Sequence, residues 1–352
     1  MLKQAAALLC MCVCMVTWIG CANTSSHYVY AAVPTANEVS VFREDPNSGV
    51  LTAVAGSPFV AGAGAHAIAV HPSGKFLYVA NSGESDISLF TIATGGILTE
   101  VTPRTLAGTT PVLMQMDPAG SFLYVANAGT NDIYVFSIDS GSGALTQTGS
   151  HYPLGVVPLN MTLSSSGVLY VTGSGTFGYV EAFTANSGVL TPLNGSPYQV
   201  GTNPYGLTID PSGSYLYTAN NIDNSISGFS IASDGSLTPL ADFPLGETFT
   251  NPISVIVDPS DKYLFVTNEG SSNVAVYTVD SGGGLTILTN SPFTTGSGPS
   301  FMATDPNGKY LLVGLQTGAG IQVFSLDPST GTLVSDATYS TGGTPTSFVV
   351  TQ

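Results

Sequence analysis

Few residues of this 352-residue chain combine a reactive side chain with a position where several segments would meet. His66 and Glu269 could transfer protons, and Arg104 could hold an anion. Four asparagines that recur at one repeat position could present amides to a ligand: Asn81, Asn127, Asn220 and Asn268. More ordinary roles stay open for all of them: packing for His66, a solvated loop carboxylate for Glu269, and turn formation for the asparagines.

The segments that position these residues are copies of one phrase. It is HPSGKFLYVAN from His71, and related copies start at Asp117, Asp210, Asp258 and Asp305, with a shorter one at Ser164 and a truncated one at His27. An aromatic residue follows each copy, at intervals of 46 to 48 residues: Phe42, Phe90, Phe136, Phe183, Phe229, Tyr277 and Phe324. Seven copies at this period indicate a single domain over residues 28–352.

Each repeat is expected to form four short strands. Between Ala65 and Val101, two apolar strands flank the His71-Pro-Ser-Gly turn, a third alternates with period two, and a fourth follows Gly95-Gly96. Four strands per unit of this length predict an all-β, seven-bladed β-propeller of antiparallel blades. Because the chain starts with a second-type strand and ends with a first-type strand, the C-terminal segment Thr346–Val350 should join three N-terminal strands and close the ring.

In such blades, the loops from second to third strands and from outer to next inner strands share one face. That face should carry the four asparagines, Glu269 and His66, whereas Lys75, Lys262 and Lys309 should lie on the opposite face. Arg104 is the cation expected to approach the mouth. We therefore predict a binding site at the centre of the first face, which is the usual place for a propeller site.

The LYVAN-type phrase resembles the YVTN-repeat propellers and the seven-bladed lactonase family, which includes bacterial 6-phosphogluconolactonases, over residues 27–352. The resemblance implies a sugar-lactone hydrolase. Of the family's acid, base and cationic positions, His66 matches a histidine, and Asn268-Glu269 matches an N-E element in another blade. The other positions depart from the family pattern: Lys75, Asn81, Asp86, Val112-Leu113 and Asn127-Ala128.

These departures leave two functions open. Lactone opening needs an activated water and oxyanion stabilisation, and an anionic substrate also needs a cationic clamp. The chain has only six Lys and Arg residues against 22 Asp and Glu. The resemblance favours a lactone hydrolase, whereas the scarcity of cations favours a non-catalytic propeller that binds a protein, peptide or glycan. Whether the protein is an enzyme is not decided by the sequence.

Charge excludes some classes of partner. A formal net charge of −16 argues against nucleic acid and against anionic membrane surfaces. Asp132, Asp223 and Asn224 carry oxygen ligands but lack the spacing of a calcium loop, so we expect no metal and no cofactor. The expected form is a monomer with a small molecule, glycan or protein at its mouth.

The amino end is expected to be a targeting segment. Lys3 precedes an apolar run from Ala5 to Ile19 that ends at Gly20-Cys21, which predicts a signal peptide over residues 1–20 and a linker over 21–27. The Gly-Cys junction resembles a bacterial lipobox, with Cys21 as the lipidated first residue, although Trp18 replaces the preferred leucine. A simple cleaved signal and an uncleaved anchor are the alternatives. All three place the protein outside the cytoplasm, at the cell envelope or secreted.

Overall fold

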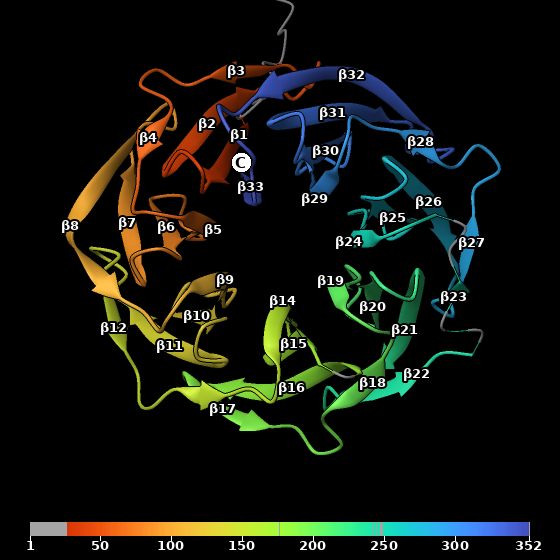
Figure 1. Cartoon of the computed structure of the whole chain (residues 1–352), viewed down its shortest axis with the longest axis horizontal. Coiled ribbons are helices and arrows are strands. Elements are labelled where there is room, and N and C mark those ends of the chain that lie inside the picture. The colour runs from red at the N-terminus through yellow and green to blue at the C-terminus, as the bar shows by residue number, and fades with distance from the viewer. Residues whose placement is uncertain (1–26, 176, 242, 244, 247–248, 352) are drawn as a thin grey trace, which may run out of the picture.

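Seven β-sheets are arranged in a ring in the computed structural model (Figure 1). The structure describes residues 27–175, 177–241, 243, 245–246 and 249–351. The expected signal peptide and Cys21 lie outside these residues. The described part of the chain forms strands and turns, and it contains no helix long and apolar enough to cross a membrane.

Each sheet is antiparallel and forms one blade, and its innermost strand lies nearest the centre of the ring. Blade 1 runs from β33 (Ser347–Thr351) through β1 (His27–Val33) and β2 (Glu38–Glu44) to β3 (Leu51–Ala53). Blade 2 contains β5 (Ala65–Val70), β6 (Phe76–Asn81), β7 (Asp86–Ile92) and β8 (Leu98–Leu106). Blade 3 contains β9 (Pro111–Met116), β10 (Phe122–Asn127), β11 (Asp132–Ile138) and β12 (Leu145–Gln147). Blade 4 contains β14 (Val157–Leu163), β15 (Val168–Ser174), β16 (Gly178–Asn186) and β17 (Val189–Pro192).

The remaining blades repeat this order. Blade 5 contains β19 (Pro204–Ile209), β20 (Tyr215–Asn220), β21 (Ser225–Ile231) and β22 (Leu237–Pro239). Blade 6 contains β24 (Pro252–Val257), β25 (Tyr263–Asn268), β26 (Asn273–Val279) and β27 (Leu285–Ile287). Blade 7 contains β29 (Pro299–Thr304), β30 (Tyr310–Leu315), β31 (Gly320–Leu326) and β32 (Leu333–Ser340). A short additional strand pairs with the third strand in blades 1, 3, 4, 5 and 6: β4 (Phe59–Val60), β13 (Tyr152–Pro153), β18 (Tyr198–Val200), β23 (Leu245–Gly246) and β28 (Phe293–Thr294).

The ring closes as the sequence predicts. Strand β33 from the C-terminal end pairs antiparallel with β1, with Tyr28 opposite Thr351 and Ala32 opposite Ser347. Blade 1 therefore joins both ends of the described chain in one sheet. This pairing leaves neither terminal strand as an open edge.

The apolar strands are buried because each blade is covered on both faces by its neighbours. One core cluster joins Tyr30 and Val41 of blade 1 to Leu77 and Phe90 of blade 2, all at most 2% exposed. Seven such clusters lie within the described residues and follow the seven junctions between blades. Because most strands are covered on both faces, most of their side chains can be apolar. This accounts for the small number of charged residues in the chain.

In each blade, one glycine packs directly against a side chain of the preceding blade. This contact was not predicted from the sequence. The glycine lies two residues before the outer-strand leucine in every blade, at Gly49, Gly96, Gly143, Gly188, Gly235, Gly283 and Gly331. At Gly143, φ is +73° and an added Cβ would lie 2.7 Å from the ring of Phe76 in the preceding blade. A glycine is therefore required there by both the backbone conformation and the packing.

The aspartate of the repeated phrase organises the turn between the first and second strands. Asp258 Oδ1 accepts hydrogen bonds from the backbone N–H groups of Lys262 and Tyr263 at 2.8 and 2.7 Å. Asp305 does the same for Lys309 and Tyr310. These carboxylates are turn-forming groups on the face opposite the inner-strand starts.

Candidate functional site

A cavity of about 760 Å³ opens where the inner strands begin, at the centre of the ring. Residues at the starts of β5, β9, β14, β19, β24 and β29 line it, together with residues 344–347 just before and within β33. Residues that follow the second strands complete the lining, among them Ala128, Asn221, Glu269 and Gln316. The cavity therefore occupies the face on which we predicted the site.

A β-bulge at the start of each of six inner strands supplies the ring of side chains that lines this cavity. In blade 2, Ala65 pairs with Asn81 and Ala67 with Ala80, so His66 is the extra residue between them. A bulge re-aims a side chain relative to the regular pleat. The corresponding extra residues also line the cavity: Val112, Leu159, Tyr205, Ile253, and Ser300 with Phe301. His66 is therefore the one imidazole in an otherwise mainly apolar ring.

The contacts of His66 determine which ring nitrogen can act on a ligand. Nδ1 lies 3.1 Å from the carbonyl oxygen of Val112. Because a carbonyl only accepts hydrogen bonds, Nδ1 must carry the proton, and in the neutral ring Nε2 keeps its lone pair. Nε2 makes no hydrogen bond to any described residue. The backbone carbonyl of His66 accepts from Thr346 Oγ1 at 2.7 Å, which ties the bulge to the segment before β33.

Burial keeps this imidazole neutral. Removal from water lowers the pKa of His66 below its usual 6.5, and the hydrogen bond to the Val112 carbonyl opposes that effect in part. The side chain is therefore a neutral hydrogen-bond acceptor at pH 7. This is the protonation state that a general base needs.

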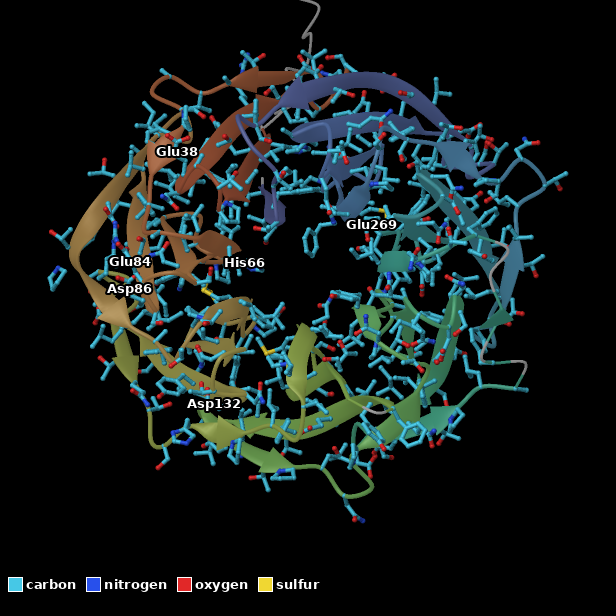
Figure 2. The ribbon with its side chains drawn as sticks, in the orientation of Figure 1. Glu38, His66, Glu84, Asp86, Asp132 and Glu269 are labelled. Carbon is cyan, nitrogen blue, oxygen red and sulfur yellow. The ribbon has the colours of Figure 1, made fainter. Side chains whose placement is uncertain are left out.

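Glu269 lines the same cavity from the far side of the channel. It follows β25 in blade 6, and Figure 2 places it across the ring from His66 in blade 2. Its backbone N–H donates to the Asn251 carbonyl at 2.9 Å, which holds the loop in place. The structure thus brings both candidates to one cavity without pairing them. Their catalytic roles stay predictions.

The four asparagines lie at the ends of the second strands and are fully buried. Asn81 Nδ2 donates to Asp86 Oδ1 at 2.7 Å and to Ser88 Oγ at 3.0 Å, and its Oδ1 accepts from the Gly62 N–H. Within their own blades, the other three donate to Asp132, to Ser225 and Ser227, and to Asn273. None of the four is among the residues that line the cavity. These contacts fit turn formation, and ligand binding by the asparagines stays untested.

Arg104 does not approach the mouth as expected. It lies on β8, the outermost strand of blade 2 (Figure 1), and does not line the cavity. Its Nε donates to Glu100 at 2.7 Å and its Nη1 to Glu84 at 2.5 Å, and Asp86 is 4.0 Å away. The sequence predicts Arg104 in a connection that leads to an inner strand. In the structure, the outer strand β8 continues through that segment, and the nearby carboxylates form ion pairs with the guanidinium.

The cavity has little charge of its own. Among the described residues that line it, none is lysine or arginine, and Glu269 is the one carboxylate. The amides of Asn203 and Gln316 also line it, and their side chains form no hydrogen bond with any described residue. Neutral hydrogen-bonding groups and apolar surface are therefore what the cavity offers to a ligand.

Comparisons with known proteins agree with this architecture. The family model described as "Lactonase, 7-bladed beta-propeller" matches residues 24–157, 155–248 and 246–350. This chain belongs to the seven-bladed β-propeller lactonase family. The family assignment predicted from the repeated phrase is thereby confirmed, as is the seven-bladed fold.

Solved structures of this lactonase fold are similar in shape but distant in sequence. A candidate 6-phosphogluconolactonase of Bacteroides fragilis has a TM-score of 0.82 at 22% identity, covering 93% of this chain and 98% of that chain. The periplasmic gluconolactonase of Pseudomonas aeruginosa has a TM-score of 0.79 at 17% identity, with 93% and 99% covered. A Lactobacillus plantarum protein scores 0.80 at 19% identity, with the same coverage. A comparison with curated proteins finds no match.

Proposed function

We propose that this lactonase-family propeller hydrolyses an uncharged lactone in the central cavity, with His66 as the general base. One observation carries the proposal. The Val112 carbonyl holds the proton on Nδ1 of His66, so Nε2 is an acceptor in a ring of mostly apolar side chains. Membership of the lactonase family supports the reaction class.

The reaction follows from this geometry. Nε2 accepts a proton from water, and the resulting hydroxide attacks the lactone carbonyl. The tetrahedral oxyanion then collapses with cleavage of the ring C–O bond. The alkoxide that leaves takes the proton back from the imidazolium, which yields an open hydroxy acid. The amides of Asn203 and Gln316 are among the cavity groups that can donate a hydrogen bond to the oxyanion.

Charge selects the substrate. A phosphorylated lactone needs cationic side chains at its phosphate, and no cationic side chain is present among the described residues that line the cavity. The carboxylate of Glu269, which lines the same cavity, would also repel the phosphate group of such a substrate. The ring of Val112, Leu159, Ile253 and Phe301 instead suits a lactone with an apolar face. We therefore favour a neutral lactone over 6-phosphogluconolactone.

The location proposed for the protein is outside the cytoplasm. The apolar amino end and the Gly20-Cys21 junction support export, with Cys21 as a lipid attachment site. The structural similarity to a periplasmic gluconolactonase is consistent with that location.

A binding propeller without catalysis is the second candidate. The observation in its favour is that His66 has a carbonyl as its orienting partner, and that Glu269 lies across the channel instead of beside the imidazole. A base supported by a carboxylate would be stronger. In this case the cavity would bind a neutral small molecule, a glycan or a peptide without turning it over.

The two candidates are separated by an assay on purified protein. Neutral glucono-lactone, an alkyl δ-lactone and 6-phosphogluconolactone are incubated with wild type, His66→Ala and His151→Ala, and hydrolysis is followed against the spontaneous rate. His151 is an exposed histidine stacked on Tyr134, so it is the matched control. We expect turnover of a neutral lactone that falls about 100-fold or more in His66→Ala and is unchanged in His151→Ala.

Three results would count against parts of the proposal. Equal turnover by His66→Ala and wild type would exclude His66 as the base. Preference for the phosphorylated lactone would contradict the charge argument. Ligand binding measured by calorimetry, with no turnover on the whole panel, would favour the binding propeller.

A further inference from the structure

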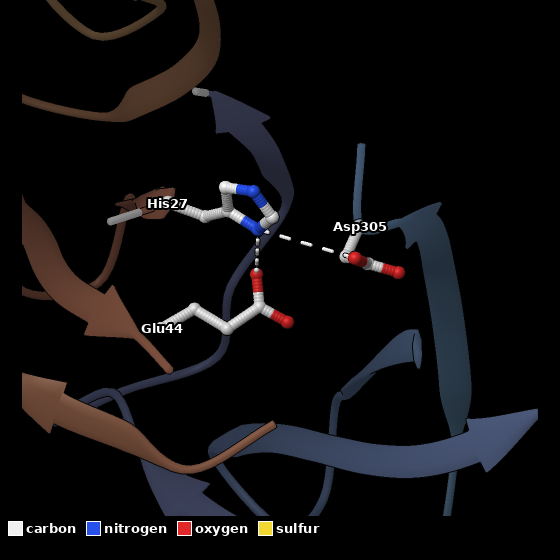
Figure 3. Close-up of side chains that lie close together, drawn as sticks. All are labelled: His27, Glu44 and Asp305. Atoms are coloured by element: carbon white, nitrogen blue, oxygen red, sulfur yellow. Dashed lines mark hydrogen bonds and ion pairs between the residues drawn. The ribbon is translucent and has the colours of Figure 1, made fainter. Parts of the chain in front are cut away.

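A second group of reactive side chains is buried on the face opposite the cavity. His27 begins β1, Glu44 ends β2, and Asp305 lies in the turn between β29 and β30. They are 2%, 0% and 0% exposed, and they point toward one another at the junction of blades 7 and 1 (Figure 3). One ligand atom from each residue lies within 4.8 Å of the others.

Glu44 is exceptional among the blades. The residue that occupies the same register position, opposite the outer-strand leucine, is aliphatic in the six other blades: Ile92, Ile138, Ala185, Ile231, Val279 and Leu326. The fold therefore does not need a carboxylate at this position. A carboxylate buried in place of an aliphatic side chain is costly unless something compensates its charge.

The described residues do not compensate Glu44. Its Oε2 lies 3.2 Å from His27 Nδ1, but its Oε1 is buried without any hydrogen-bond partner in the described part of the chain. Lys309 is the nearby cation, and its Nζ contacts the Pro46 carbonyl at 3.5 Å without an ion pair to either carboxylate. The cluster thus has an unused buried ligand atom and two carboxylates facing one imidazole.

Asp305 adds a second anionic ligand. Its Oδ1 accepts from the N–H groups of Lys309 and Tyr310, and its Oδ2 accepts from Asn307 N at 3.1 Å. Oδ2 lies 3.9 Å from His27 Nδ1, on the side that faces Glu44.

We propose that His27, Glu44 and Asp305 bind a divalent transition-metal cation that fastens blade 7 to blade 1. Two ligand atoms at about 2.1 Å from one metal ion are about 3.0 to 3.4 Å apart, which matches the 3.2 Å between Nδ1 and Oε2. The 3.9 Å between Nδ1 and Oδ2 requires a shift of a few tenths of an ångström. One imidazole and two carboxylates suit zinc or manganese, with water in the remaining positions.

A second layer of contacts supports this arrangement. Asn307 Nδ2 lies 3.4 Å from His27 Nε2, and rotation of that amide would present its oxygen to a protonated Nε2 while Nδ1 binds the metal. Burial, and after it the neighbouring carboxylates of Asp305 and Asp45, raise the pKa of Glu44 to about 8.

The site is independent of lactone hydrolysis, because it lies on the opposite face from His66. Its function is to fasten blade 7 to blade 1, the blade in which the two ends of the described chain pair. The sequence predicts no metal site, since the three residues come from distant segments and match no ligand spacing. Only the closure of the ring brings Asp305 to Glu44.

Zinc titration of the full chain tests the proposal. Wild type, His27→Gln, Glu44→Ile and His71→Gln are stripped with chelator, and Zn²⁺ binding is measured by calorimetry and by the unfolding midpoint. Glu44→Ile installs the residue that three other blades carry, so it should fold. His71 contacts Ser73 and the Gly120 carbonyl with no carboxylate, so it is the control. Cysteines outside the described residues would bind zinc equally in every variant.

We expect one zinc site, in addition to any zinc bound by cysteines, that is present in wild type and lost in His27→Gln and Glu44→Ile. Zinc at about 100 times its Kd should raise the wild-type midpoint by roughly 5 °C. Affinity at this site should fall by more than about 100-fold in His27→Gln and Glu44→Ile, and stay unchanged in His71→Gln. Metal-free Glu44→Ile should melt no lower than metal-free wild type. Zinc responses that are equal in all four proteins, or a wild type that responds to neither Zn²⁺ nor Mn²⁺, would overturn the proposal.

Discussion

The glycine contact between blades allows a sharp test of how the ring is packed. Gly143→Ala adds one methyl group at φ +73°, where its carbon would lie 2.7 Å from Cγ and Cδ1 of Phe76. Phe76 is 5% exposed and cannot move its ring into solvent. Gly74→Ala is the matched control, because Gly74 has φ +67° and nothing within 4 Å of an added Cβ.

Both substitutions place an alanine at positive φ, but only Gly143→Ala also adds a methyl group at a packed junction between blades. An alanine at positive φ costs about 1–2 kcal/mol, and the reduced freedom of the unfolded chain returns about 0.4–1 kcal/mol. Gly74→Ala should therefore lose roughly 1 kcal/mol. Gly143→Ala should lose a further ~1–3 kcal/mol because its methyl group overpacks the junction of blades 2 and 3.

Urea unfolding followed by circular dichroism measures both free energies. The slope of the transition should be the same for wild type and the two variants, so that the midpoints report stability. Equal destabilisation by Gly143→Ala and Gly74→Ala would refute the argument. It would mean that Phe76 and the adjoining blade yield to the methyl group without cost.

Three further predictions follow from single contacts. Tyr170→Phe removes a 2.6 Å hydrogen bond to the Gly235 carbonyl and should cost about 1–3 kcal/mol, whereas Tyr124→Phe, at the same repeat position without such a bond, should cost less, as thermal unfolding can measure. Any lactone hydrolysis should be constant above pH 6.5 and fall only at lower pH, because burial lowers the pKa of His66; a pH–rate profile with its acid limb centred above 6.5 would contradict this. Truncation after Thr346 removes β33 and exposes the edge of β1, so gel filtration and calorimetry should show aggregation and a loss of cooperative unfolding; an unchanged monomeric transition would show that closure is dispensable.

The repeated phrase was enough to predict the fold. Its interval of 46 to 48 residues predicts the number of blades, and its strand-turn-strand pattern predicts their topology. The first and last strand types predict the pairing of β33 with β1. These features depend on local sequence and on a period, so they can be derived without coordinates. The glycine two residues before each outer-strand leucine was also visible in the sequence and was missed.

The site depended on the tertiary structure in a different way. The sequence places His66 near an inner-strand start, but the bulge that turns it into the channel appears only in the pairing of β5 with β6. The Val112 carbonyl that sets its tautomer comes from the next blade. Arg104 was misplaced because β8 continues through it to Leu106, where Glu100 of the same strand and Glu84 of the turn between β6 and β7 bind its guanidinium.

The sequence by itself determined a closed ring of seven blades. Six blades are built from adjacent segments whose strand pattern and spacing are local properties, and the strand types at the two ends predict how blade 1 is completed. Only the tertiary structure decided which side chains meet. The apolar ring around His66 and the cluster of His27, Glu44 and Asp305 both join residues from different blades. Distances between such residues depend on how the blades pack and close, and no local pattern in the chain records them.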